Sequence, residues 1–159
     1  MFASLIIRSA TTRDRPQSRA AIIDLQDHER RLHATRMPGE QIADAYLDWM
    51  LEQVQVEGLC LVAEGDGEFC GFVAGWVENS DAIAETPDSQ RFGYISDIWV
   101  MPPFRGHGIA TRLLQEIELR LRRTGVTRVR INVLAANASA RAAYERAGFA
   151  VYEIQYEKP

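Results

Sequence analysis

Two glycines, Gly106 and Gly108, separate a predicted strand from an amphipathic segment, and their spacing is typical of a ligand-binding turn. Because glycine has no Cβ, the backbone here can turn tightly and come close to a ligand. The first N–H groups of a helix have no intrahelical acceptor and lie at the positive end of its dipole, where phosphate oxygens bind. The sequence therefore predicts a phosphate-binding loop; the alternative is a turn that only connects strand to helix. The predicted loop and first helical turn contain Arg105, Gly106, His107, Gly108, Ile109, Ala110 and Thr111.

Two common nucleotide-binding patterns do not fit this loop. A nucleoside-triphosphate loop needs Gly-Lys-Ser/Thr, and that triplet does not occur in the sequence. A dinucleotide fingerprint needs Gly or Ala where Thr111 stands, and an acidic residue near the end of the next strand, where the chain has Asn132. The sequence therefore disfavours ATP, GTP and dinucleotides as ligands.

A second group of residues follows the next predicted strand. Tyr144 lies seven residues after Asn137 and four before Gly148. By residue type alone, a tyrosine in a short helix is expected to pack in the core, and an asparagine at its start is expected to be the helix N-cap, a role compatible with ligand binding.

The elements that must position these residues follow from hydrophobic periodicity and turn signals. Antiparallel hairpins come first, with Gly65-Asp66-Gly67 as the strongest turn signal, and a strand–helix–strand crossover follows. This order predicts an α/β fold with a mixed, mostly antiparallel sheet and helices on both faces. The predicted strands are 5–9, 59–64, 69–77, 92–101, 126–134 and 149–156, and the predicted helices are 16–35, a segment after Pro38-Gly39, 106–123 and 138–147, with 78–91 as a loop.

The two groups together resemble the GCN5-related N-acetyltransferase (GNAT) family. Residues 105–110 (Arg-Gly-His-Gly-Ile-Ala) match that family's Arg/Gln-x-x-Gly-x-Gly/Ala signature. The ending from Asn137 through Tyr144 to Gly148-Phe149 is similar to the family's Asn-x6-Tyr-x3-Gly-Phe pattern. The similarity of pattern extends from about residue 71 to 156, whereas the N-terminal half fits the family's topology without a sharp motif.

This resemblance implies a GNAT-type fold that uses acetyl-CoA as cosubstrate. The pyrophosphate would rest on the loop 105–111, and the pantetheine arm would pair with the strand backbone at Trp99, Val100 and Met101. Asn137 matches a pantetheine contact. Tyr144 matches the residue whose hydroxyl faces the CoA sulfur, which implies a role as general acid. The implied reaction is acetyl transfer to a primary amine of a small molecule or peptide, by direct attack in a ternary complex.

The general base is less well defined by the sequence. Some members of the family carry a glutamate on the fourth strand, and the matching position here is Ser96. Asp97 falls on the opposite face of a regular strand, so it could act only if a β-bulge turned it inward. Otherwise a chain of water molecules would relay the proton, ending on Glu29 or Glu85, which we expect on the acceptor side of the cleft. If there is no base, the chain could instead be a non-catalytic CoA-binding regulatory module.

Composition limits the remaining possibilities. The 159 residues predict one domain, 1–159. Residues 1–90 contain 16 acidic and 7 basic side chains (net −9), whereas residues 91–159 contain 6 and 11 (net +5). The acidic half would face the acceptor, which predicts a positively charged amine; the alternative is that these carboxylates only solvate exposed elements. Among the 18 basic residues there is one lysine, Lys158.

The sequence also bears on the partners of the protein and on its location. The pI of about 5.4 argues against nucleic acid, and no apolar run is long enough to span a membrane. His28 and His33 are five residues apart, not four, so we expect no metal site. With only Cys60 and Cys70 there is no disulfide framework, which predicts a cytoplasmic location. We expect a homodimer, the commonest soluble oligomer.

Overall fold

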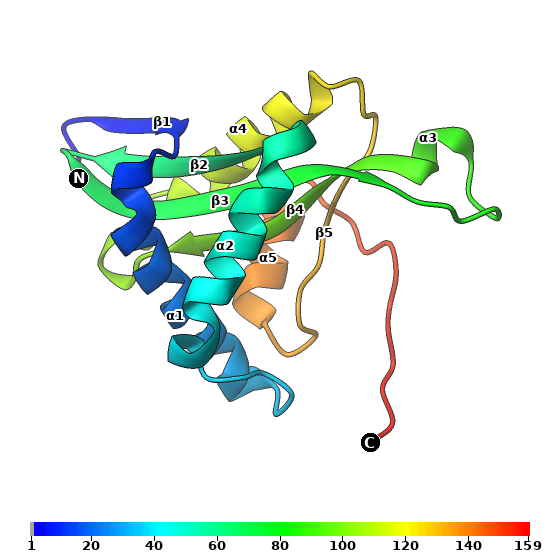
Figure 1. Ribbon diagram of the computed structural model, residues 1–159, viewed down its shortest axis with the longest axis horizontal. Coiled ribbons are helices and arrows are strands. Elements are labelled where there is room, and N and C mark those ends of the chain that lie inside the picture. The colour runs from blue at the N-terminus through cyan, green and yellow to red at the C-terminus, as the bar shows by residue number, and fades with distance from the viewer. Residues whose placement is uncertain (1) are drawn as a thin grey trace.

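A five-stranded sheet forms the centre of the computed structural model, which describes residues 2–159 (Figure 1). The strand order is β1-β2-β3-β4-β5; neighbouring strands are antiparallel except β4 and β5, which are parallel. The mixed, mostly antiparallel sheet predicted from the sequence is therefore confirmed. The strands are β1 (Leu5–Ser9), β2 (Gly58–Gly65), β3 (Glu68–Asn79), β4 (Arg91–Val100) and β5 (Val129–Ile131).

Helices cover both faces of this sheet, as predicted. On one face, α1 and α2 bury Ile22, Leu47 and Met50 against Phe72 and Trp76 of β3. On the other face, α4 packs on the sheet, and α5 adds Tyr144 to the same cluster. The helices are η1 (Thr12–Asp14), α1 (Arg15–Leu32), α2 (Gly39–Glu57), α3 (Pro87–Gln90), η2 (Pro102–Phe104), α4 (Ile109–Arg122) and α5 (Ala138–Arg146). The short α3 lies within the segment predicted as a loop.

The β2–β3 hairpin is closed by the turn that the sequence predicts. Asp66 and Gly67 both have positive φ, 52° and 86°. Two consecutive left-handed residues form the type I′ turn that matches the twist of paired strands. The carboxylate of Asp66 also accepts the N–H of Ser4 at 2.8 Å, which ties the start of the chain to this turn.

Helix α4 positions the glycine loop because its apolar stripe is fully buried. Leu113, Ile117 and Leu121 recur every fourth residue, and each is less than 1% exposed. Apolar residues at this spacing form one face of a helix, so they hold α4 flat against the sheet. The N-terminus of α4 is thereby held at the end of β4, where the glycines lie.

The C-terminal prediction was wrong. The segment 149–156 forms no strand, and β5 is only three residues long instead of spanning 126–134. Because β5 is so short, it offers few backbone groups for a further ladder. Side chains hold the segment instead: the Tyr152 hydroxyl donates to Glu85 at 2.9 Å, and Arg130 stacks on the Tyr152 ring. From Val151 onward the tail is exposed, Lys158 included, and it runs along the outside of the molecule (Figure 1).

Candidate active site

Strands β4 and β5 separate after three paired residues, which leaves one edge of β4 open (Figure 1). Their ladder ends at the pair Ile95–Ile131. Farther along β4, the Met101 N–H donates to the Cys70 carbonyl of β3 at 2.9 Å. Because backbone groups alternate in direction along an antiparallel strand, those of Ile98 and Val100 face away from β3. They therefore line the open edge, in the stretch predicted to pair with pantetheine.

The glycine loop continues from this edge with backbone N–H groups available for an anion. Gly106 and Gly108 have φ of 80° and 74°, and a Cβ added at either would meet nothing within 4 Å. The first backbone hydrogen bond of α4 is donated by the Arg112 N–H to the Gly108 carbonyl oxygen. The N–H groups ahead of it, at Ile109, Ala110 and Thr111, have no carbonyl four residues back in the helix. The loop thus has the open space and the donors of a phosphate cradle.

Arg105 and His107 shape this loop through their side chains. The Arg105 guanidinium lies 4.4 Å from the centre of the Trp99 ring, and its Nε donates to the Val100 carbonyl at 3.0 Å. His107 Nδ1 lies 2.9 Å from the Arg105 carbonyl oxygen. Arg105 therefore occupies a backbone acceptor that belongs to the open edge. The Trp99 Nε1 is buried and has no hydrogen-bond partner within residues 2–159.

A β-bulge turns Asp97 toward α1 and α2. In the β3 register Ala74 faces Asp97 and Gly75 faces Ile95, so Ser96 has no partner. Because of the extra residue, Asp97 lies on the same face as Tyr94, together with Trp99 and Met101, all of which pack with α1 and α2. The structure thus contains the bulge that Asp97 requires to point inward.

The environment of Asp97 is buried and contains hydroxyl groups. Its Oδ1 accepts the Tyr46 hydroxyl at 2.9 Å, and its Oδ2 accepts the Ser96 hydroxyl at 2.6 Å. Burial raises the pKa of Asp97, and the nearby negative charge of Glu29 raises it further; the two hydroxyl bonds oppose this shift. A carboxyl group with a raised pKa in such a position has the character of a general base.

Tyr144 packs and also keeps its hydroxyl available. Its ring lies 6.3 Å from that of Phe149, edge to face, and it contacts the core beneath α4. Burial raises its pKa, and the negative charges of Glu29 and Asp97 are near enough to raise it further. The hydroxyl makes no hydrogen bond to another described residue. Core packing and proton donation are therefore compatible at Tyr144.

Asn137 is the N-cap of α5. Its Oδ1 accepts the Ala140 N–H at 3.2 Å and the Ser139 hydroxyl at 3.1 Å. An asparagine in this position satisfies donors that the first helical turn leaves free. The capping role predicted as an alternative is thus observed, and it fixes the start of the helix that bears Tyr144.

The two glutamates predicted on the acceptor side lie in different places. Glu29 pairs with Arg36 at 3.0 Å, and its charge acts on both Asp97 and Tyr144. Glu85 lies in the β3–β4 loop, where it accepts the hydroxyls of Ser89 and Tyr152. That loop precedes β4, whereas Asp97 is seven residues into the strand, about 20 Å away at 3.3 Å per residue. The structure brings Glu29, and not Glu85, to the region of Asp97.

Two residues near the site were not predicted. Tyr46 lies in the helix predicted after Pro38-Gly39 but was assigned no role in the site, and His28 was considered only as a metal ligand. The His28 ring lies 5.6 Å from that of Trp99, and Tyr46 bonds to Asp97. A tyrosine on a buried stripe needs a partner for its hydroxyl, and this was the available signal for Tyr46.

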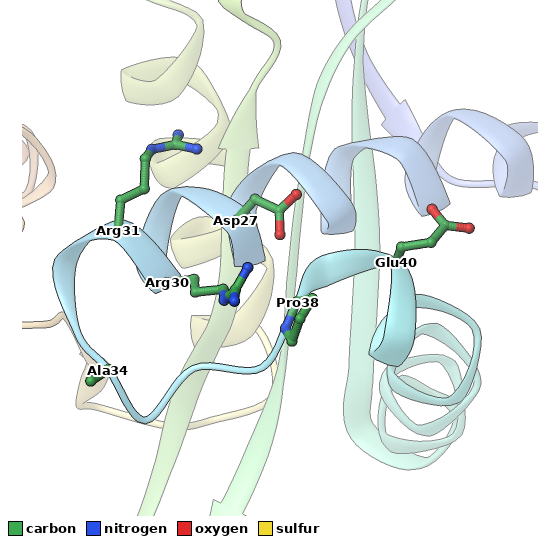
Figure 2. A pocket seen from close by; sticks show the side chains of 6 residues that line it. All are labelled: Asp27, Arg30, Arg31, Ala34, Pro38 and Glu40. Atoms are coloured by element: carbon green, nitrogen blue, oxygen red, sulfur yellow. The ribbon is translucent and has the colours of Figure 1, made fainter.

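A separate hollow of about 640 Å³ lies where α1 ends and α2 begins (Figure 2). The Asp27 carboxylate there accepts the Gly39 N–H at 2.7 Å and so fixes the first turn of α2. Its lining includes neither Asp97 nor Trp99, and Arg30 lies about 200° around α1 from His28, whose ring packs near Trp99. This hollow is therefore distinct from the Asp97 region. It is lined by Asp27, Arg30, Arg31, Ala34, Pro38 and Glu40.

A metal site and thiolate chemistry find little support in residues 2–159. The described side chains include no group of three or more His, Cys, Asp or Glu that could hold a metal ion. Cys60 and Cys70 are free and buried, and burial raises the pKa of the Cys60 thiol to about 12. Thiolate chemistry at Cys60 is therefore disfavoured. Within the same residues, none of the helices has the length and hydropathy needed to cross a membrane.

Comparisons with known proteins agree with this architecture. The chain is 31% identical over 75 residues to "Uncharacterized N-acetyltransferase YycN" of Bacillus subtilis (strain 168); the match covers 47% of this chain and about half (48%) of that relative. The fold is that of a GCN5-related N-acetyltransferase from Ralstonia eutropha (TM-score 0.77, 18% identity, 98% of both chains). It is also that of the aminoglycoside N-acetyltransferase AAC(6')-Iy solved with CoA (TM-score 0.72, 20% identity, 98% of this chain and 95% of that one).

The family model for the acetyltransferase (GNAT) family matches residues 20–149, which include both β4 and the glycine loop. Because this match extends over most of the chain, the protein belongs to the GNAT acetyltransferase family.

Proposed function

We propose that the protein transfers an acetyl group from acetyl-CoA to a primary amine by direct attack in a ternary complex. One observation carries the proposal: the open edge of β4 runs from the glycine loop to Asp97, in the region that also holds Tyr144. A ligand bound along this edge would have its anionic end at the start of α4 and its other end between a base and an acid.

The residues present fit acetyl-CoA. The N–H groups of the loop 105–111 would hold the pyrophosphate, with Arg105 as a charged donor. The backbone of Ile98 and Val100 would pair with the pantetheine amides as an added strand. Arg105 would release the Val100 carbonyl as it turns to the phosphates. Acetyl-CoA supplies an acetyl group activated as a thioester.

The chain itself supplies orientation and proton transfer. An alkylammonium has a pKa of about 10.4 in water, so the acceptor must lose a proton before it attacks. The Asp97 carboxylate would take that proton, directly or through water, and the backbone N–H of Val100 would polarise the acetyl carbonyl. The Tyr144 hydroxyl would protonate the departing sulfur. Direct transfer is favoured because both cysteines are buried on earlier strands.

The charge of the region favours a cationic acceptor. Asp97 is 7% exposed, and no basic side chain of residues 2–159 lies within ion-pair distance of it. Glu29 also acts on Asp97 as a negative charge, although Arg36 pairs with it at 3.0 Å. An ammonium group would supply the positive partner that Asp97 itself lacks, and carboxylates raise the local concentration of cations.

We expect steady-state CoA release to depend on both the amine and the salt concentration. A diamine should give a higher kcat/KM than an amine with a neutral chain, and added salt should reduce this preference because it screens the carboxylates. The measurement is thiol release with both amines at low and high salt. If no amine in a broad panel releases CoA although acetyl-CoA binds, the chain is the non-catalytic module instead.

We also propose a cytoplasmic homodimer. The tail supports self-association because Val151, Tyr152, Ile154 and Tyr156 are each more than 60% exposed, and such exposed apolar side chains are typical of interfaces. Sedimentation should give a species of twice the 17.9 kDa chain mass. A single species of one chain mass across the working concentration range would contradict the dimer.

A further inference from the structure

Residues 2–159 contain two buried carboxylates, Asp14 and Asp97, whose pKa values are shifted in opposite directions. Asp14 is 6% exposed and Asp97 is 7% exposed. Asp14 receives two bonds of 2.8 Å from the Arg8 guanidinium, which lowers its pKa to about 2. Asp97 has no such cation among the described residues, and its pKa is raised. Their solvent exposure is nearly equal, but burial is the largest cause of the raised pKa of Asp97, whereas the Arg8 guanidinium is the largest cause of the lowered pKa of Asp14. Asp97 depends on hydroxyl groups alone for favourable interactions.

Tyr46 is the hydroxyl donor that reaches Asp97 from another element. It lies on α2, and its hydroxyl is 2.9 Å from Oδ1 and 3.1 Å from Oδ2 of the carboxylate. Its ring packs 5.3 Å from that of Trp49, which limits its movement. Burial raises the pKa of Tyr46, so the hydroxyl stays protonated and donates throughout the working pH range.

The other groups around Asp97 show why the Tyr46 hydroxyl matters for the ionisation of this carboxyl group. Glu29 of α1 is the charged group among them, and its negative charge opposes ionisation of Asp97. The Ser96 hydroxyl bonds only to Oδ2, so it leaves Oδ1 to Tyr46. The titratable or charged groups that interact electrostatically with Asp97 are Glu29 of α1, Tyr46 of α2, Cys60 of β2, Tyr94 of β4 and Tyr144 of α5.

We propose that Tyr46 is a positioning residue that orients the Asp97 carboxylate and keeps it ionised, so that it can take the proton of the acceptor amine. This inference rests on the proposed acetyl transfer with Asp97 as base. Tyr46 does not touch the reacting atoms in this scheme. It acts through Asp97, and it links α2 to the bulge of β4.

The test is the pH profile of kcat/KM in Tyr46→Phe. Loss of a hydrogen bond that favours the charged form raises the pKa of Asp97, so the acidic limb should move to higher pH by about one unit. Well above this limb kcat should fall little, since Asp97 is ionised there in both proteins. Tyr156→Phe removes a hydroxyl from an 89% exposed tail residue and serves as the control with no shift.

A direct titration separates this inference from the proposed function. The pKa of the Asp97 carboxyl can be followed by carbon NMR, with Asp97→Asn used for assignment, and this readout needs no turnover. A raised pKa in Tyr46→Phe supports the inference even if no amine is acetylated. An unchanged pKa and an unmoved limb, with kcat reduced equally at all pH values, would overturn it. If Tyr46→Phe does not fold, Tyr46→Met, whose flexible side chain adapts to the space and which also lacks the hydroxyl, takes its place, and the same shift is expected.

Discussion

Gly108→Asp should abolish the thermal stabilisation that acetyl-CoA gives the parent protein. At a ligand concentration 100 times Kd, binding adds about 2.7 kcal/mol of stability. For a chain of this size that corresponds to a Tm rise of about 5–10 °C. The aspartate would place a negative charge where the loop receives phosphate, at the N-terminus of α4, where the helix dipole favours anions. Thermal denaturation with and without acetyl-CoA measures the effect.

The control must separate charge from backbone strain, because Gly108 has a φ of 74° that disfavours a side chain. Gly125 also has a positive φ, 92°, and a Cβ there would meet nothing within 4 Å. It lies beyond the other end of α4, about 21 Å away for 14 helical residues. Gly125→Asp should lower the Tm without ligand and retain the shift. An undiminished shift in Gly108→Asp would show that the loop does not bind the phosphates.

Tyr144→Phe should reduce kcat by about 10²–10⁴-fold, the usual contribution of a positioned general acid. The Kd for CoA should stay close to that of the parent, because the ring and its contact with Phe149 remain. Only the hydroxyl, which bonds to no other described residue, is removed. Steady-state turnover and CoA binding by calorimetry give the two quantities.

The opposite result would assign Tyr144 to packing alone. In that case kcat would be unchanged, or kcat and Tm would fall together. A different acetyl donor provides a further check. An acetyl thioester whose leaving thiol has a low pKa needs less help from a general acid. The reduction in kcat caused by Tyr144→Phe should therefore be smaller with such a thioester.

The sequence predicted the loop and its supporting helix because both depend on local patterns. Gly106 and Gly108 have the positive φ that glycine permits, and the every-fourth-residue stripe from Leu113 to Leu121 is buried. Asn137 caps its helix because capping depends on neighbours within three residues. These features need no knowledge of distant parts of the chain.

The parts that the sequence left open depend on distant contacts. The face that Asp97 occupies is set by the register between β3 and β4, where one extra residue reverses the alternation. Tyr46 meets Asp97 across 51 residues of sequence, so no local pattern could pair them. The tail has the composition of a strand, but strand formation also requires a neighbour, and β5 ends after three residues.

The exposed tail carries the one lysine of the chain, while the other 17 basic side chains are arginines. A guanidinium stays protonated at any physiological pH, so it has no free electron pair with which to attack a thioester. An enzyme that holds an activated acyl group near its own surface is at risk of modifying itself. Here the basic side chains that provide charge, from Arg8 to Arg146, are inert toward that reaction, and the single reactive amine side chain lies in the exposed tail.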